Sequence, residues 1–245
     1  MTGVSAAENR RITALVDHYA ENKEKFSTLL YQLSGYVAAS KVLARVVHST
    51  KQRTKDPEHL RAKLRRKLIG AKESNKAFDI DEDNLFKRIN DLAGFRIIHL
   101  HTRQVKEIHD ELSAVFDEQR WILVEGPIAK TWDDESRRYF RALKWETEES
   151  ESMYTSVHYV VQPNSRSEVT CEIQVRTLME EVWGEVDHTI NYPVTSPSQS
   201  CREQIKVLAR LTSSCSRLVD SIFLASAELQ SSTPSRSGRK LRKQT

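Results

Sequence analysis

The sequence reads Tyr154-Thr155-Ser156-Val157-His158 and, shortly afterwards, Glu172-Ile173-Gln174-Val175-Arg176-Thr177. Alternate side chains of an extended strand share one face. The first segment therefore directs Tyr154, Ser156 and His158 to one side, and the second directs Glu172, Gln174 and Arg176 to one side. Val169, Cys171, Ile173 and Val175 are expected to point into the protein. These faces carry a phenol, an imidazole, a carboxylate, an amide and a guanidinium, which is a more varied set of groups than a solvent-exposed face needs. The set predicts the floor of a nucleotide site.

Helical and strand patterns alternate around these two segments. Apolar residues recur every three and four positions over residues 10–48, with Gly35 as a candidate break. Asp56-Pro57-Glu58 supplies an N-cap, a first-turn proline and an early acid, which begin a helix that runs towards Lys72. Further helices are expected over 84–92, 104–117, 178–192 and 199–229, and strands over 95–100, 121–124, 154–163 and 168–177. The strand from 121 is expected to close at Gly126-Pro127, and residues 129–152 to form a partly helical excursion.

This order of elements predicts an α/β (α+β) fold, with a mixed β-sheet of about five strands flanked by helices. Residues 1–230 are expected to form a single domain with helical flanks at both ends. Residues 231–245 are rich in Ser, Arg and Lys without apolar periodicity, which predicts a disordered tail.

Composition indicates a soluble enzyme domain. The chain has 245 residues, of which 38% are hydrophobic, so it can bury a sizeable core. No apolar run approaches the roughly 20 residues that span a bilayer, and charged residues from Glu8 onwards argue against a secretory signal. The three cysteines form no C-x-x-C pair, which favours reduced thiols and a cytoplasmic location.

A row of cations surrounds the predicted N-cap. Arg53 and Lys55 precede it, and steps of four from Lys55 reach His59 and Lys63 on one helix face. Like charges at this spacing repel one another unless an anion lies along them. One interpretation is a polyphosphate cradle, in which Arg makes forked contacts and Lys supplies point charges. The other is a solvated face, which is the commoner meaning of a charge run on its own.

Two of the acidic residues could form a metal site, but the sequence alone does not show which two. Asp91 lies at a helix-to-strand junction, where Asp often forms a cap or turn. Paired with Glu172 it would suit Mg²⁺, which takes one or two carboxylates and leaves its other positions to phosphate and water. The residues alone leave this choice open among 34 acids. No G-x-x-x-x-G-K-[ST] loop is present, so any nucleotide must be held by side chains.

Taken in order, the motifs resemble the synthetase domain of Rel/SpoT homologues. The matching segments are Arg53-x-Lys55 with the basic helix through Lys63, Asp91-Leu-Ala-Gly-Phe-Arg96, Tyr154-x-Ser156-x-His158, Glu172-Ile-Gln-Val-Arg-Thr177, and then Trp183, His188 and Tyr192. The resemblance covers residues 40–192, and the flanking helices resemble those of single-domain small alarmone synthetases. It implies a nucleotidyltransferase-like sheet and an ATP-dependent, GTP pyrophosphokinase-type transferase of the bacterial stringent response.

The resemblance also implies residue roles. The family moves pyrophosphate from ATP to the 3′-hydroxyl of GDP or GTP, giving (p)ppGpp and AMP. The implied ATP-binding residues are Arg53, Lys55, His59, Lys63 and Arg96. Asp91 and Glu172 are the implied catalytic and Mg²⁺-binding carboxylates, with Glu172 also accepting the proton of the acceptor hydroxyl. The implied acceptor-binding residues are Tyr154, which stacks on guanine, with Ser156, His158, Gln174 and Arg176.

Departures from the family pattern concern the acceptor. Met153 and Thr155 replace a glycine and a basic residue beside Tyr154, and Glu180 and Glu181 bring negative charge towards the guanine. One alternative is a toxin that pyrophosphorylates the 3′ CCA end of tRNA, which the basic tail favours. Another is an inactive nucleotide- or RNA-binding regulator. The expected partners are ATP with a guanosine nucleotide or tRNA, and no membrane. A homo-oligomer and an antitoxin or other regulatory partner stay open.

Overall fold

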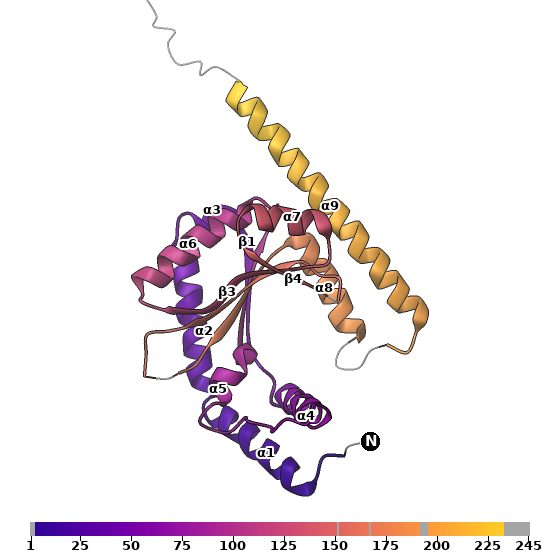
Figure 1. Ribbon diagram of the computed structural model, residues 1–245. Coiled ribbons are helices and arrows are strands. Elements are labelled where there is room, and N and C mark those ends of the chain that lie inside the picture. The colour runs from indigo at the N-terminus through magenta and orange to yellow at the C-terminus, as the bar shows by residue number, and fades with distance from the viewer. Residues whose placement is uncertain (1–2, 151, 167, 192–195, 233–245) are drawn as a thin grey trace, which may run out of the picture.

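The computed structural model describes residues 3–150, 152–166, 168–191 and 196–232. In chain order the elements are α1 (Ala6–Glu21), α2 (Lys23–Ala39), α3 (Leu43–Val46), β1 (Val47–Thr54), α4 (Pro57–Glu73), α5 (Leu85–Arg88), the short 3-10 helix η1 (Asn90–Leu92), β2 (Ala93–His99), α6 (Gln104–Glu118), β3 (Ile122–Thr131), α7 (Asp134–Ala142), β4 (Glu146–Glu149), β5 (Ser156–Gln162), β6 (Cys171–Thr177), α8 (Leu178–Asn191) and α9 (Gln199–Ser232) (Figure 1). Within the described residues, six strands form one sheet in the order β1-β2-β6-β5-β3-β4. The pairs β2-β6 and β3-β4 are parallel and the other pairs antiparallel, so the predicted mixed sheet is confirmed.

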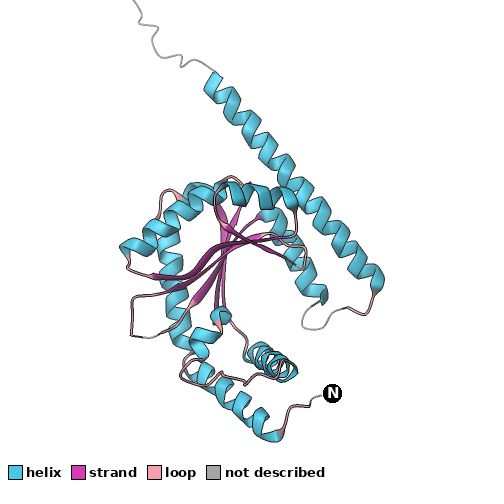
Figure 2. Cartoon of the chain, in the orientation of Figure 1, coloured by secondary structure: helices cyan, strands magenta, loops and turns pink. Residues whose placement is uncertain are grey.

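The sheet has one apolar and one polar face, because side chains alternate along each strand. Val157 pairs with Val175 and Tyr159 with Ile173, and all four are almost fully buried. They belong to a core shared with α2 and α6, which lie along one side of the sheet (Figure 2). The register places His158 beside Gln174 on the other face, where α8 packs against β6 and β2. The strand pairing thus gathers polar side chains on one surface.

The two edge strands, β1 and β4, were not predicted. β1 was expected to be the end of a helix and a basic segment, and β4 to be part of a helical excursion. Both consist mainly of polar residues, several of them exposed, so neither has the alternation of apolar and polar residues that predicts a strand. These segments are strands because their backbones pair with β2 and β3. The sheet therefore has six strands where about five were expected, and charged side chains suit exposed edges.

Helix boundaries follow local signals more closely. Asp56 caps α4 as predicted, with its Oδ1 accepting from the amides of Glu58 at 2.9 Å and His59 at 3.1 Å. The N-terminal helical region is broken at Asn22, whereas Gly35 lies inside α2, so the candidate break at Gly35 was wrong.

β3 continues through Gly126-Pro127 to Thr131, although it was expected to stop there. Pairing with β5 shifts register between Leu123 and Glu125 and between Glu125 and Ile128. A bulge of this kind accommodates a proline, which has no N–H to donate to the ladder.

α8 and α9 pack together as the last two elements, and α9 then continues beyond the rest of the fold (Figure 1). Residues up to Ser232 belong to α9, so the helix runs into the segment expected to be a tail. The rest of that prediction, residues 233–245, lies outside the described residues. In the part of the chain that the structure describes, no helix combines the length and apolar character needed to cross a membrane.

Candidate active site

A cavity of about 250 Å³ opens on the polar face of the sheet. Its walls come from β1, η1, β2, β6 and α8. Five predicted site residues line it: Arg53, Asp91, Arg96, Glu172 and Gln174. Six further residues that were not assigned to the site also line it, three of them ionisable (Lys51, Glu185 and His188) and three not (Gln52, Gly94 and Phe95). The two predicted carboxylates therefore share one cavity with cations from two strands.

Asp91 is held between two lysines. Lys55, just after β1, places its Nζ 2.6 Å from Oδ2, and Lys63, on α4, places its Nζ 2.9 Å from Oδ1. Burial raises the pKa of Asp91, but the charges of Lys63 and Lys55 outweigh burial and keep the pKa below its ordinary value. Asp91 is therefore ionised at neutral pH. Its carboxylate is an anion that offsets the repulsion between Lys55 and Lys63.

Glu172 is oriented by two neighbours on its own face. Nδ1 of His158 lies 3.2 Å from Oε1, and Nε2 of Gln174 donates to Oε2 at 2.9 Å. Burial raises the pKa of Glu172, but the hydrogen bond and charge of His158 outweigh it and lower the pKa overall. Two ionised carboxylates lining one cavity are the donor set that Mg²⁺ accepts. No cluster of three or more His, Cys, Asp or Glu that could hold a metal occurs among the described residues.

A network of ion pairs forms the wall between β1, β2 and α8. Arg96 contacts Glu185 at 2.7 Å and Glu181 at 3.3 Å, and Lys51 contacts Glu181 at 2.8 Å. Arg176 pairs with the other oxygen of Glu181. Three cations thus surround Glu181, so its charge is compensated and is not free to repel an acceptor. Lys51 shares one face of β1 with Arg53, but sequence reasoning missed it because the segment from Val47 to Thr54 carries no strand pattern.

Tyr154 lies beside the cavity rather than on its wall. Its ring centroid is 6.0 Å from that of His158. The side chain packs with Trp183 of α8 and with Ile205 and Ala209 of α9. An aromatic ring is therefore positioned next to Glu172 and its partner His158, and its role towards an acceptor stays a prediction.

Three other predicted residues do not line this cavity. Ser156 is buried and donates to the carbonyl of Val175 at 3.3 Å, and Arg176 is buried beneath Gly184 of α8. His59 lies half-buried on α4 outside the cavity wall. The geometry gives Ser156 and Arg176 internal partners, and their contact with a substrate stays a prediction, as does that of His59.

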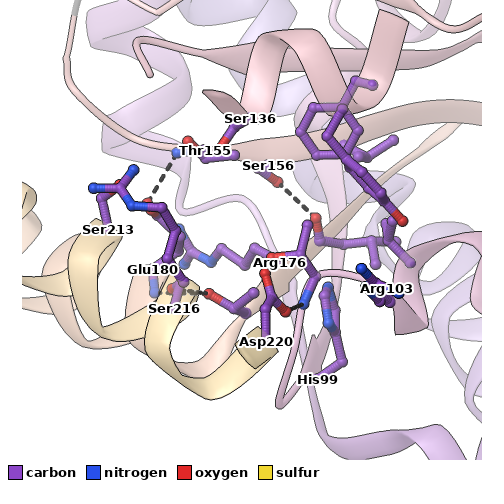
Figure 3. Close-up of a pocket in the computed structure, with 18 of the residues that line it drawn as sticks. His99, Arg103, Ser136, Thr155, Ser156, Arg176, Glu180, Ser213, Ser216 and Asp220 are labelled. Carbon is purple, nitrogen blue, oxygen red and sulfur yellow. Dashed lines mark hydrogen bonds between the residues drawn. The ribbon is translucent and has the colours of Figure 1, made fainter. Parts of the chain in front are cut away.

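A second cavity, of about 220 Å³, lies between β5, β6 and helices α6, α7 and α9 (Figure 3). Glu180 forms part of its wall and accepts from the amide of Thr155 at 2.9 Å. Only 5% of Glu180 is exposed, and burial raises its pKa to about 7. Glu180 thus anchors the residue next to Tyr154 through the backbone amide of Thr155.

Several solved structures have a fold similar to that of this chain. No curated protein matches the chain. A GTP pyrophosphokinase family protein from Streptococcus pneumoniae is 18% identical, with a TM-score of 0.54 over 92% of this chain and 97% of that one. The small alarmone synthetase 2 from Bacillus subtilis is 20% identical, with a TM-score of 0.58 over 86% and 98%. The small alarmone synthetase 1 from the same organism, bound to its product pppGpp, is 20% identical, with a TM-score of 0.51 over 86% and 94%. These structures share the fold.

The sequence itself establishes the kinship that the motifs suggested. The profile of the family described as "Region found in RelA / SpoT proteins" matches residues 52–196, more than half of the chain. The match runs from the first basic motif past the end of α8 and so contains every carboxylate and cation of the cavity except Lys51. The chain belongs to the RelA/SpoT family.

Proposed function

We propose that the chain transfers the pyrophosphoryl group of ATP to the ribose 3′-hydroxyl of GDP or GTP, producing (p)ppGpp and AMP. The observation that carries the proposal is the single cavity in which Asp91 and Glu172 lie with Arg53 and Arg96. Membership of the RelA/SpoT family supports it, as does the shared fold with a synthetase whose structure holds pppGpp.

The cations suit the donor. Pyrophosphoryl transfer spreads negative charge over phosphoryl oxygens, so it depends mainly on positioning and on cations already in place. Arg53 and Arg96 line the cavity, and Arg96 is fixed by Glu185. Lys55 and Lys63 are fixed at its edge by Asp91. These side chains would receive the ATP phosphates with little rearrangement.

Asp91 and Glu172 would hold Mg²⁺. Their fit to the ion rests on oxygen donors, on ionisation despite burial and on a shared cavity. When bound, Mg²⁺ would neutralise charge on the phosphates of the donor. Lys55 and Lys63 keep Asp91 ionised, and His158 and Gln174 keep Glu172 ionised and oriented, so the protein prepares both ligands.

Glu172 would also accept the proton of the attacking 3′-hydroxyl. An ionised carboxylate is a competent general base when it lies within hydrogen-bond reach of that proton. Its position beside His158, and so beside Tyr154, allows an acceptor base to stack on the ring of Tyr154 while its ribose faces Glu172. Stacking of this kind contributes about 1–3 kcal/mol in nucleic-acid complexes.

The test supplies γ-labelled ATP with GDP, GTP or deacylated tRNA in separate reactions. Label in guanosine tetra- or pentaphosphate is expected. Glu172→Gln should abolish that transfer while binding of a fluorescent ATP analogue stays near the wild-type level. Glu168→Gln is the matched control, since Glu168 is exposed and pairs with Lys87 away from the cavity.

The remaining outcomes separate the alternatives. Label on tRNA alone would replace the guanosine acceptor with the tRNA 3′ end. Binding of ATP without transfer to any acceptor would make the chain a nucleotide-binding regulator. Full activity of Glu172→Gln would remove Glu172 from its role as base.

A further inference from the structure

The N-terminal helix α1 carries one buried hydroxyl. It belongs to Tyr19, the last of the four buried residues of this helix, which are Ile12, Leu15, Val16 and Tyr19. The other three are aliphatic and pack in the main core, and Tyr19 packs there with 0% of its surface exposed. A phenylalanine would fill nearly the same space. Because a buried hydroxyl is costly unless it is hydrogen-bonded, the partner of the Tyr19 oxygen indicates why a tyrosine is present.

That partner is the backbone at the place where β1 and β2 separate. The pairing of the two strands ends with Thr54 opposite Ala93. One residue further along, the amide of Lys55 donates to the carbonyl of Leu92 at 2.8 Å. The Tyr19 hydroxyl donates to the carbonyl of Lys55 at 2.7 Å and lies 3.4 Å from the carbonyl of Leu92. The hydroxyl therefore joins two backbone segments that are distant in the sequence.

Both segments carry side chains of the candidate active site. Lys55 contacts Asp91, the residue before Leu92, at 2.6 Å, and Asp91 lines the cavity. α1 also packs along α4, the helix that carries Lys63, and Figure 1 shows the two helices side by side. Lys63 is the second cation on Asp91. All three charged groups thus stand on backbone that contacts α1.

We propose that Tyr19 is a positioning residue for the transfer reaction, whose hydroxyl fixes Lys55 and Asp91 relative to each other. The inference rests on the proposed function, in which Lys55 receives donor phosphates and Asp91 holds Mg²⁺. Because Tyr19 is fully buried, it acts through these two residues and not by contact with a substrate. Tyr19 lies outside residues 52–196, the region that matches the RelA/SpoT family. The N-terminal helix is therefore part of the donor side of the site.

Replacement of the hydroxyl alone tests this role in the full-length protein. Tyr19→Phe keeps the ring, and Tyr36→Phe is the matched control, since it removes a hydroxyl that donates to Gln119 at 2.8 Å, between α2 and the end of α6. With γ-labelled ATP and GDP, Tyr19→Phe should lower kcat/KM for ATP about 10- to 100-fold and keep the KM for GDP within about twofold, because misplacement of the donor-side groups affects that substrate alone. Tyr36→Phe should match the wild type in both constants.

Amide hydrogen exchange provides a readout that does not depend on catalysis. In Tyr19→Phe the amide of Lys55 should exchange about 3- to 10-fold faster, the factor that the loss of one hydrogen bond implies. In Tyr36→Phe the same amide should keep its wild-type rate. An unchanged Lys55 amide in Tyr19→Phe would overturn the proposal, as would kinetic constants equal to those of Tyr36→Phe.

A stabilising solute separates positioning from stability. Sucrose favours the buried core and keeps Tyr19→Phe folded if the substitution weakens the fold. The low kcat/KM for ATP should persist in sucrose, whereas recovery to the wild-type value would show that the hydroxyl acts on stability alone and would overturn the proposal. A wild type that transfers no label to any acceptor would remove the proposed function only. The exchange rate of the Lys55 amide would then still decide whether Tyr19 fixes that residue.

Discussion

Replacement of Glu180 by Gln should make this protein more stable at alkaline pH and leave its stability at acidic pH almost unchanged. Glu180 is 5% exposed and has a pKa of about 7, against an ordinary value of 4.5. Each tenfold change in proton affinity corresponds to about 1.4 kcal/mol. Ionisation of Glu180 therefore costs the folded state about 3 kcal/mol relative to the unfolded chain.

The sign follows from where the proton is held. Between pH 4.5 and about 7 the folded protein retains a proton on Glu180 that the unfolded chain has released. Stability therefore falls as pH rises through this window and stays lowered above it. Gln does not titrate, and its side-chain oxygen can still accept from the amide of Thr155, which is the bond that Glu180 makes.

Urea unfolding at pH 5 and pH 8 measures the effect. The free energy of unfolding of Glu180→Gln should exceed that of the wild type by up to about 3 kcal/mol at pH 8 and by less than about 1 kcal/mol at pH 5. Glu118→Gln is the control, since Glu118 is exposed at the end of α6. The amide resonance of Thr155 should titrate near pH 7 in the wild type and stay constant in Glu180→Gln. The same stability difference at both pH values would refute the assignment of Glu180 as a buried acid.

Three further changes probe the site and its support. Tyr154→Ala should raise the KM for the guanosine acceptor roughly 5- to 150-fold, as the loss of about 1–3 kcal/mol of stacking implies, and should leave the KM for ATP nearly unchanged; equal effects on both would exclude stacking. Lys63→Met removes one of the two cations on Asp91 and should raise the KM for ATP about 10- to 100-fold, whereas Lys67→Met, one turn further along α4, should have little effect. Gly126→Ala should lower the free energy of unfolding by about 2–4 kcal/mol, because φ is +104° and a Cβ would lie 2.4 Å from the carbonyl oxygen of His158. Gly35 lies inside α2 with open space around it, so Gly35→Ala should instead raise the free energy of unfolding by about 0.5–1 kcal/mol. Thermal or urea unfolding measures both.

Sequence reasoning succeeded where a residue's signal is local. The cap at Asp56 and the alternation in β5 and β6 depend on neighbours within a few positions, and both appear, although β5 begins at Ser156 and leaves Tyr154, which was expected on the strand, just before it. β1 failed because Val47 to Thr54 has no apolar period, and only pairing with β2 makes it a strand. That pairing sets Lys51 opposite Arg96 and Arg53 opposite Gly94. The ion pairs that neutralise Glu181 could not be predicted for the same reason. Its three cation partners come from three separate strands.

Three half-buried or buried acids near the site show why composition could not assign roles. Asp91 and Glu172 stay ionised because Lys55, Lys63 and His158 oppose the effect of burial on their pKa values. Glu180, only eight residues after Glu172, has a backbone amide as its hydrogen-bond partner, and its pKa rises to about 7. Magnesium and a hydroxyl proton both require a carboxylate that is already ionised. The cation neighbours, which only the folded chain defines, therefore separate the two acids suited to phosphate chemistry from the one suited to anchoring the loop at Thr155.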